Sequence, residues 1–404
     1  MSLKPQTNIL ELFESKDLVK ICAPMVRYSK LQFRNLVRQY DCDLVFTPMI
    51  LADSICKSSK ARNNEFTTNL MDTPLVVQFA ANEIHDFVGA SYLVAPYCDG
   101  VDLNCGCPQR WAKEMKLGCE MLKNPQIVYD LVRQCRNTIP KPFTVSVKTR
   151  ILKDLKRSVE IARQLEHSGV SFLTIHSRYP EDNCGPINQE ALKNICESVQ
   201  VPVVGNGGLT TLEECYELKT KTGIKGVMVA NGILTNPELF SGSNKTSLQC
   251  IQKWLDICYN STLTSTEYNS TEYYGTIHEK PHNLTFQCFH HHLVFMLEKV
   301  LTRKQRRVFN NFKCFKHVLI FLNEHLGIKP QLFTPETFSR YNSLDTDYSG
   351  REVCYNELNP SKNTCNMKPQ HDYLATSGKF FNSKQNVDNV DVDSHWSDIF
   401  DEAD

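Results

Sequence analysis

Two cysteines, Cys105 and Cys107, follow a short apolar run and stand among Asn104, Gly106 and Pro108. An apolar run that stops in Asn, Gly, Cys and Pro is typical of a buried strand that delivers polar side chains to a loop. Most cysteines simply pack, because free cysteine is among the most buried residue types. Gly106 and Pro108 place Cys107 in a turn, where a side chain contributes little to packing, so Cys107 is a candidate reactive thiol. Strand alternation points Cys105 away from the side of Asn104, so it is expected to pack.

Short apolar runs recur along the first 240 residues, separated by segments of helical length. The runs are residues 21–26, 43–49, 74–80, 100–106, 143–150, 172–178, 201–208 and 226–232. The helical candidates between them are residues 29–40, 52–62, 84–94, 125–136, 155–167, 189–198 and 211–222. Apolar strands joined by helix-length connections imply a parallel sheet covered by helices. Eight such repeats predict an α/β fold of the (β/α)8-barrel type rather than an open doubly wound sheet.

Residues with chemical potential stand at the end of each predicted strand, where a (β/α)8 barrel builds its active site. They are Pro24 and Met25, Thr47 and Pro48, Gln78, Asn104 and Cys107, Lys148 and Arg150, His176 and Arg178, Asn206 to Gly208, and Ala230 to Gly232. Each alone has an ordinary explanation, such as a solvated charge for Lys148 or a hydrogen-bonded core residue for His176. Their convergence on one mouth instead indicates a ligand site.

Glycine-rich loops at 206–208 and 230–232 follow the last two predicted strands, a position where barrels often bind phosphate. Lys148 offers a cation beside a ring that becomes negative on reduction, and Gln78 and His176 offer hydrogen bonds. These features fit flavin mononucleotide (FMN). Reduction of a conjugated carbon–carbon double bond also needs a proton, and a cysteine with an ordinary pKa of about 8.5 is mostly thiol at neutral pH. Cys107 is therefore the candidate acid.

Composition excludes more than it assigns. The chain has 404 residues, 41% of them hydrophobic, and its 45 Lys and Arg balance its 45 Asp and Glu, so net charge indicates no partner. The start lacks the apolar segment of a signal peptide, and the 17 cysteines are scattered, which predicts reduced thiols in the cytoplasm or nucleus. No cysteine pair has zinc spacing and no apolar run is long enough to cross a bilayer, so neither metal nor membrane is expected.

The chain changes character after the barrel pattern. We expect a barrel domain at residues 1–242, a helical domain at 243–330, and a polar, acidic and disordered tail at 331–404. Helices are predicted at 248–259 and within 284–326, with a polar connection at 260–274 between them. The second helical block carries basic residues, which are Lys299, Arg303, Lys304, Arg306 and Arg307. A basic face is usually solvated surface, and adjacent histidines at 290–292 diverge on a helix, which argues against a metal site.

Several motifs together resemble the tRNA-dihydrouridine synthases. They are Ala23-Pro24-Met25, Asn104-Cys105-Gly106-Cys107-Pro108, Val147-Lys148-Thr149-Arg150, Ile175-His176-Ser177-Arg178, Asn206-Gly207-Gly208 and the run 227–240. The likeness spans residues 21–328, and the stretches at 23–30 and 107–112 look closest to the eukaryotic subgroup that modifies positions 20a and 20b of the tRNA D-loop. The resemblance implies that FMN, re-reduced by NADPH or NADH, reduces uridine to 5,6-dihydrouridine while Cys107 protonates C5 of the base.

The resemblance also implies roles for individual residues. The flavin-binding positions are Pro24, Met25, Val26, Gln78, Lys148, His176, Asn206, Gly207, Gly208, Ala230 and Asn231. The tRNA side comprises Asn104, Arg150, Arg178 and the basic helical block, since phosphate contacts supply affinity without sequence information. The family usually has Gly-Arg where this chain has Ala230-Asn231, and glycine where it has Lys116.

Two other interpretations stay open on the sequence. One is an FMN oxidoreductase acting on a free pyrimidine-like molecule, which would have no use for a basic helical block. The other is a catalytically impaired RNA-binding homologue that has lost its flavin. A yellow purified protein would exclude the second.

Overall fold

Parallel strands close into a barrel at the centre of the molecule. The computed structural model describes residues 6–182, 185–261, 263, 268–269, 284–349 and 351. The barrel strands are β1 (Val19–Cys22), β2 (Leu44–Phe46), β4 (Leu75–Ala80), β5 (Gly100–Cys105), β6 (Thr144–Arg150), β7 (Phe172–His176), β8 (Val203–Asn206) and β9 (Gly226–Val229). β1 pairs with both β2 and β9, and β2 pairs with β4, so the ring is complete. Each predicted apolar run overlaps one of these strands, which confirms the (β/α)8 barrel.

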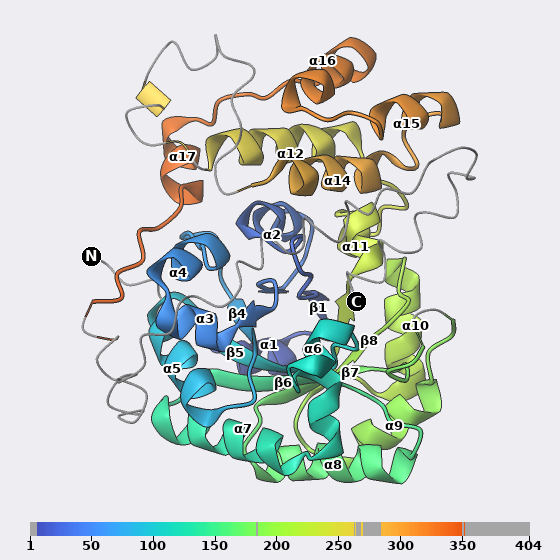
Figure 1. Ribbon diagram of the computed structural model, residues 1–404. Coiled ribbons are helices and arrows are strands. Elements are labelled where there is room, and N and C mark those ends of the chain that lie inside the picture. Colours follow the sequence, from blue (N-terminus) through green and yellow to red (C-terminus); the bar gives the residue numbers. More distant parts are fainter. Residues whose placement is uncertain are drawn as a thin grey trace.

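Helices surround the barrel between successive strands (Figure 1). They include α2 (Leu31–Arg38), α5 (Ile84–Val94), α7 (Gln126–Thr138), α8 (Leu155–His167), α9 (Gln189–Ser198) and α10 (Leu212–Thr222). Shorter elements are α1 (Ile9–Ser15), α6 (Arg110–Glu114), η2 (Gly118–Lys123) and α11 (Asn231–Thr235). The helix predicted at 52–62 is instead two, α3 (Ala52–Lys57) and α4 (Ser59–Glu65). The hydroxyl of Ser58 accepts the backbone N–H of Ala61, and serine stabilises a helix start better than a helix interior. A two-residue strand, β3 (Ile50–Leu51), pairs with β4.

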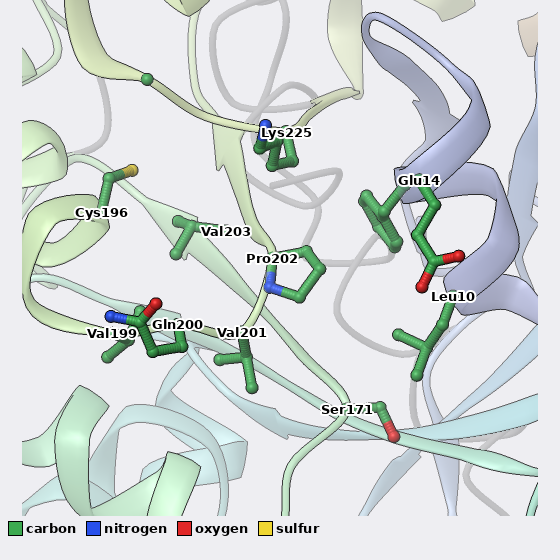
Figure 2. A pocket seen from close by; sticks show the side chains of 12 residues that line it. Leu10, Glu14, Ser171, Cys196, Val199, Gln200, Val201, Pro202, Val203 and Lys225 are labelled. Carbon is green, nitrogen blue, oxygen red and sulfur yellow. The ribbon is translucent and has the colours of Figure 1, made fainter.

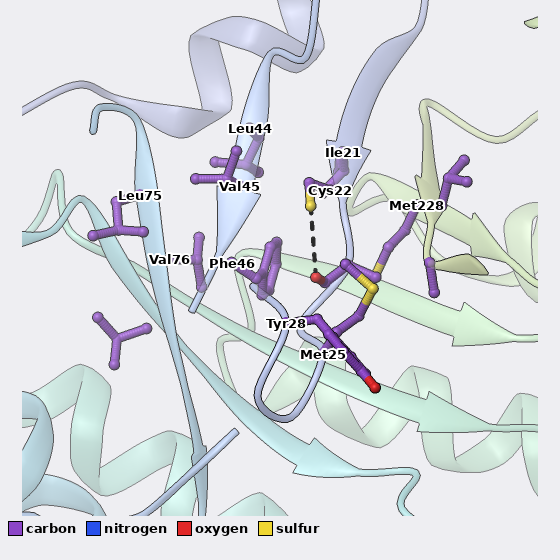
Figure 3. Packing of buried hydrophobic residues seen from close by; sticks show 14 of the residues in the cluster. Ile21, Cys22, Met25, Tyr28, Leu44, Val45, Phe46, Leu75, Val76 and Met228 are labelled. Atoms are coloured by element: carbon purple, nitrogen blue, oxygen red, sulfur yellow. Dashed lines mark hydrogen bonds between the residues drawn. The ribbon is translucent and has the colours of Figure 1, made fainter. Parts of the chain in front are cut away.

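The hydrophobic core fills the barrel and the space beneath its helices. Figure 3 shows the part formed by β1, β2 and β4, with Ile21, Leu44 and Leu75 packed inside. The Cys22 thiol donates to the carbonyl of Ala23, 3.8 Å away. All cysteines of the described chain are free thiols, and Cys105 is fully buried in the core, as its strand alternation predicts.

A block of helices lies beside one end of the barrel (Figure 1). It consists of α12 (Leu248–Asn260), α14 (Phe286–Leu297), α15 (Arg303–Phe309), α16 (Phe315–Leu326) and α17 (Pro335–Tyr341). α12 packs on α2 and α14 packs on α11, so the block rests on the barrel's first and last helices. The buried Trp254 of α12 contacts Phe33 of α2 edge to face, with ring centroids 6.4 Å apart. None of the described helices combines the length and apolarity needed to cross a membrane.

The chain stays ordered beyond residue 330, where the sequence predicted a disordered tail. Thr334 caps α17 by accepting the N–H of Thr337, and α17 packs on α12. The segment then returns to the barrel, where the N–H of Leu344 donates to the carbonyl of Thr68 and Tyr348 is buried. Isolated aromatic anchors in a polar background give no periodic pattern, which is why sequence analysis missed this segment. The remaining acidic stretch, residues 352–404, and most of the predicted connection at 260–274 lie outside the described residues.

Candidate active site

The polar strand-end residues share the inner face of the barrel. Register places Gln78 opposite Asp102 and Asp102 opposite Ser146, across β4, β5 and β6. One layer higher, Asn104 is opposite Lys148. Paired residues point to the same side of a sheet, and residues two apart along a strand share that side. These side chains therefore converge on the C-terminal mouth of the barrel.

The loop that carries Cys107 is held by the Asn104 side chain. Asn104 Oδ1 accepts the backbone N–H groups of Gly106 and Cys107, at 3.2 and 3.0 Å. The carbonyl of Cys107 accepts the N–H of Cys119 from η2. Cys107 is 8% exposed, and burial raises the pKa of its thiol. A hydrogen bond with the backbone of Gln109 and the nearby positive charges of Lys148 and Arg150 act in the opposite direction but do not cancel this effect. A protonated thiol at neutral pH can serve as an acid.

A buried hydrogen-bond chain lies directly below this loop. Asn104 Nδ2 donates to Gln78 Oε1 at 3.1 Å, and Gln78 Nε2 donates to Asp102 Oδ2 at 2.8 Å. Ser146 Oγ donates to the other carboxylate oxygen of Asp102 at 2.7 Å. Burial raises the pKa of Asp102 to about 6, while both donors favour the carboxylate. Sequence analysis assigned no role to Asp102 or Ser146, although strand alternation places Asp102 on the same face as Asn104.

His176 presents two buried ring nitrogens without hydrogen-bond partners among the described residues. Burial, together with the nearby charges of Lys148, Arg150 and Arg178, holds the pKa of His176 well below its usual range. A buried polar group without a partner is costly, so unpaired nitrogens at this mouth indicate a bound group that pairs with them. Arg150 pairs with His176 in register, and both Arg150 and Lys148 are also buried.

The glycine turn after β8 leaves room against His176. Gly207 and Gly208 have φ values of 131° and 66°, which favour glycine. A Cβ at Gly207 would lie 3.2 Å from His176 Nε2, and one at Gly208 would lie 2.9 Å from Arg178 Nη2. Asn231 Oδ1, at the start of α11, is also buried and unpartnered within the described structure. At the predicted phosphate loops, the backbone of Gly207 and Gly208 is therefore not covered by a side chain of its own, and Asn231 Oδ1 is an acceptor without a partner among the described residues. The Arg178 guanidinium lies beside Gly208.

Arg150 is buried and bound to backbone carbonyls. Its Nε donates to Gly106 at 2.9 Å, and its Nη1 donates to Tyr179 and Asp182 at 3.2 and 3.4 Å. The sequence predicted Arg150 on the tRNA side. In this position its guanidinium ties the Cys107 loop to the loop after β7, a linkage between segments remote in sequence.

The loop after β1 is joined to helix α14. His292 Nε2 donates to the carbonyl of Tyr28 at 3.0 Å, and the Cys288 thiol donates to the carbonyl of Arg27. These two contacts form a clamp between the loop after β1 and α14. The Ser29 hydroxyl accepts the N–H of Met25 at 3.0 Å, so the clamp extends to one of the predicted flavin positions. Met25 is buried, whereas its neighbour Val26 is exposed.

The buried His292 makes this clamp sensitive to acid. Burial lowers its pKa to about 3, whereas an unfolded histidine binds a proton below about 6.5. Its contribution to stability is therefore complete above pH 6.5 and falls as the pH drops toward 3. We expect His292→Gln, which keeps a donor for Tyr28, to reduce the stability loss between pH 7 and pH 5 by about 2 kcal/mol.

Urea unfolding at the two pH values tests this expectation. The exposed His167 gives the matched variant His167→Gln, which controls for removal of one histidine from the unfolded chain. Equal pH dependence in the wild type and His292→Gln would contradict the assignment.

Lys116 occupies a left-handed position in the loop beside the thiol. Its φ is 58°, which favours glycine and costs lysine about 1 kcal/mol. Asn82 Nδ2 donates to the carbonyl of Met115 at 3.1 Å and steadies this loop. Gly118 follows with φ 62°, and a Cβ there would lie 2.5 Å from the Cys107 carbonyl oxygen. Lys116 therefore adopts the left-handed conformation that a glycine adopts at lower cost.

The predicted basic residues lie on or next to α15. Lys299, Lys304 and Arg307 are exposed. Arg303 is also exposed and Arg306 is partly buried. Together they form a cationic surface on the helical block.

A separate pocket lies at the opposite end of the barrel (Figure 2). Its lining includes Leu10, Ser171, Pro202 and Lys225, from α1 and from the residues before β7, β8 and β9. The N-terminal face of a barrel contributes stability rather than chemistry. We therefore place the active site at the mouth that holds Cys107. No group of three or more potential metal ligands occurs among the described residues.

Comparisons with known proteins identify the class as barrel enzymes that act on tRNA. The family model described as dihydrouridine synthase matches residues 21–325. A mouse protein named tRNA-dihydrouridine(20a/20b) synthase [NAD(P)+]-like is 46% identical over 79% of this chain and 92% of its own length. The human protein of the same name is 44% identical over 79% of this chain and 94% of its own length.

The chain belongs to the dihydrouridine synthase family. A fission-yeast tRNA-dihydrouridine(20a/20b) synthase [NAD(P)+], from Schizosaccharomyces pombe, is 38% identical over 75% of this chain and 87% of its own length. Membership makes the chain an oxidoreductase acting on CH–CH bonds and implies the use of a flavin and NAD(P)H.

Proposed function

We propose that this protein reduces the C5=C6 bond of uridine at positions 20a and 20b of the tRNA D-loop, using FMN and either NADPH or NADH. The observation that carries the proposal is a buried thiol, Cys107, at the same barrel mouth as Lys148 and as His176, whose ring nitrogens have no hydrogen-bond partner among the described residues. Burial raises the pKa of this thiol, which favours its protonated form. Relatives named for this reaction cover most of the chain.

The residues at the mouth fit an FMN group. His176 and Asn231 offer unpaired polar atoms, and the turn at Gly207 and Gly208 offers open backbone for a phosphate. Gln78 and Lys148 border the ring position, and the loop of Pro24, Met25 and Val26, with Asn206 and Ala230, completes the set predicted from the sequence. Bound flavin supplies a hydride to one carbon of the base.

The chain's own residues supply the rest of the chemistry. Cys107 donates the proton to C5, and its raised pKa keeps that proton in place before the base arrives. Lys148 places a positive charge where negative charge develops, at a buried position. His176 is neutral, so it contributes one donor and one acceptor rather than a second charge.

The substrate must enter this mouth as a flipped base, because the target carbon is inaccessible within a stacked helix. We propose that Asn104 and Arg178 lie on the tRNA side of the mouth and that the cationic surface around Lys304 and Arg307 contacts tRNA phosphates. Such contacts bind the polymer without reading its sequence.

Mapping dihydrouridine by position tests the proposal. Cells lacking their own enzyme would express the wild-type protein, and total tRNA would be sequenced for dihydrouridine. Restoration at positions 20a and 20b is expected. Failure to restore any position by a protein that holds flavin would favour a free pyrimidine-like substrate, and a colourless protein would favour a non-catalytic RNA-binding role.

Lys148→Met should weaken flavin binding by at least about tenfold, since a hydrogen bond to a charged group contributes about 1.5–3 kcal/mol. Equilibrium titration of the apoprotein, followed by quenching of flavin fluorescence, measures this loss. Lys153→Met, a change at an exposed lysine beyond the end of β6, is the matched control. Equal affinities for the two variants would remove Lys148 from the flavin site.

A further inference from the structure

We infer that Asp102 is a positioning residue for the reaction, acting through Gln78 and Asn104 on the loop that carries Cys107. The inference rests on the proposed function of this site. Three hydrogen bonds, through Gln78 and Asn104, join Asp102 to the backbone of Cys107, so Asp102 does not itself need to touch substrate or cofactor.

The negative charge of Asp102 sets the direction of each hydrogen bond in this chain. An ionised carboxylate only accepts hydrogen bonds, so Asp102 requires Gln78 to point its Nε2 toward the Asp102 carboxylate. Gln78 Oε1 then points toward Asn104 and accepts a hydrogen bond from Asn104 Nδ2. Asn104 Oδ1 is left facing the N–H groups of Gly106 and Cys107. One carboxylate thus fixes the orientation of two amides and of the loop above them.

Reversing the two amides would break the chain at the backbone N–H groups of Gly106 and Cys107. If Gln78 rotated its amide by half a turn, its Nε2 would face the Nδ2 of Asn104, and two donors cannot pair. Asn104 would have to rotate as well, which would present Nδ2 to the Gly106 and Cys107 N–H groups. Asp102 and Ser146 are completely buried, so water cannot replace the lost partners.

Ser146 determines what happens when Asp102 is changed. In Asp102→Asn, the new amide can keep its oxygen toward Gln78 only if its nitrogen finds an acceptor. The Ser146 hydroxyl, which donates to Asp102 in the wild type, can accept instead. In Ser146→Ala, the carboxylate still accepts from Gln78. Each single variant should therefore keep the chain oriented, whereas the double variant Asp102→Asn/Ser146→Ala frees the amide to rotate.

The test is a double-mutant cycle on the flavin-loaded protein. Turnover on tRNA is expected to fall by no more than about threefold in each single variant and by at least about thirtyfold in the double variant, because coupled networks are non-additive. The rate at which iodoacetamide labels Cys107 without tRNA, read by peptide mass spectrometry, should change only in the double variant. Asp102→Asn/Ser146→Thr, which keeps the hydroxyl, should behave like Asp102→Asn.

A matched control lies immediately before the start of the same strand, β5. Asp99 is buried and accepts the backbone N–H groups of Thr7 and Leu75, so Asp99→Asn should lower stability without changing turnover per folded molecule. Additive losses in the cycle would overturn the inference. A large loss in Asp102→Asn alone would also overturn it, since Asp102 would then act as a charge partner of Lys148; this outcome is decisive even if the double variant does not fold.

Failure of the proposed function gives a different result. If the wild type makes no dihydrouridine but Cys107 labelling still changes only in the double variant, the positioning role holds and the substrate is wrong. If dihydrouridine is made and labelling is unchanged throughout, the substrate holds and the positioning role is wrong.

Discussion

Cys107→Ala is expected to lower the rate of dihydrouridine formation by about 10²- to 10⁴-fold, the usual contribution of a positioned acid. The Cys107 thiol lies at the barrel mouth, and burial raises its pKa, which favours the protonated form at neutral pH. Flavin content should not change, because Cys107 is assigned to the substrate side. Single-turnover formation of dihydrouridine in purified tRNA, with flavin absorbance recorded on the same sample, measures both quantities.

Cys105→Ala is the matched control for this prediction. It removes a thiol two residues away that is buried in the core and does not reach the mouth. Its activity per folded molecule should remain close to that of the wild type. Equal losses in the two variants would show that the loop, rather than the Cys107 thiol, had been damaged.

Asp72→Ala is expected to lower the free energy of unfolding by about 3–5 kcal/mol, the cost of leaving a buried charge unpaired. Arg34 Nη2 donates to Asp72 Oδ2 at 2.7 Å, and both side chains are buried. The same guanidinium donates to the carbonyl of Ser29, whose hydroxyl holds Met25. Flavin affinity should therefore fall together with stability. Urea unfolding and flavin titration measure the two effects.

Removing both charges provides the control. Arg34→Met/Asp72→Leu should recover part of the lost stability, because a well-packed apolar pair replaces a buried ion pair at small cost. Asp53→Ala breaks an exposed pair with Lys57 and should change stability by less than about 1 kcal/mol. A loss of that small size in Asp72→Ala would contradict the role assigned to the buried pair.

The barrel was predictable because each strand is a continuous apolar run and each connection has helical length. The ends of α5, α8 and α9 agree with the sequence pattern for the same reason. The split at Ser58 and the ordered segment around α17 were not predicted. Both depend on single capping or anchoring residues, Ser58 and Tyr348, whose effect is set by local or tertiary contacts rather than by periodicity.

The site was predictable as a set of strand ends but not as a network. Motifs pointed to Cys107 and Lys148, and register brings the strand ends to one mouth. The hydrogen-bond contacts of Asp102 and Arg150 were not predicted. Asp102 acts through neighbours on two other strands, and Arg150 binds carbonyls up to 44 residues away. Such contacts exist only after the barrel has closed, so no spacing in the sequence reveals them.

The clamp between the β1 loop and α14 also orders events during synthesis. Tyr28 and His292 are 264 residues apart, yet their hydrogen bond helps to shape a loop assigned to the flavin. A ribosome-bound chain can close all of its barrel strands before α14 emerges, because the last of them, β9, ends at Val229. The nascent barrel would at that stage lack one wall of its cofactor site. A complete flavin site is therefore expected only after α14, which ends at Leu297, has been synthesised and has docked on the barrel.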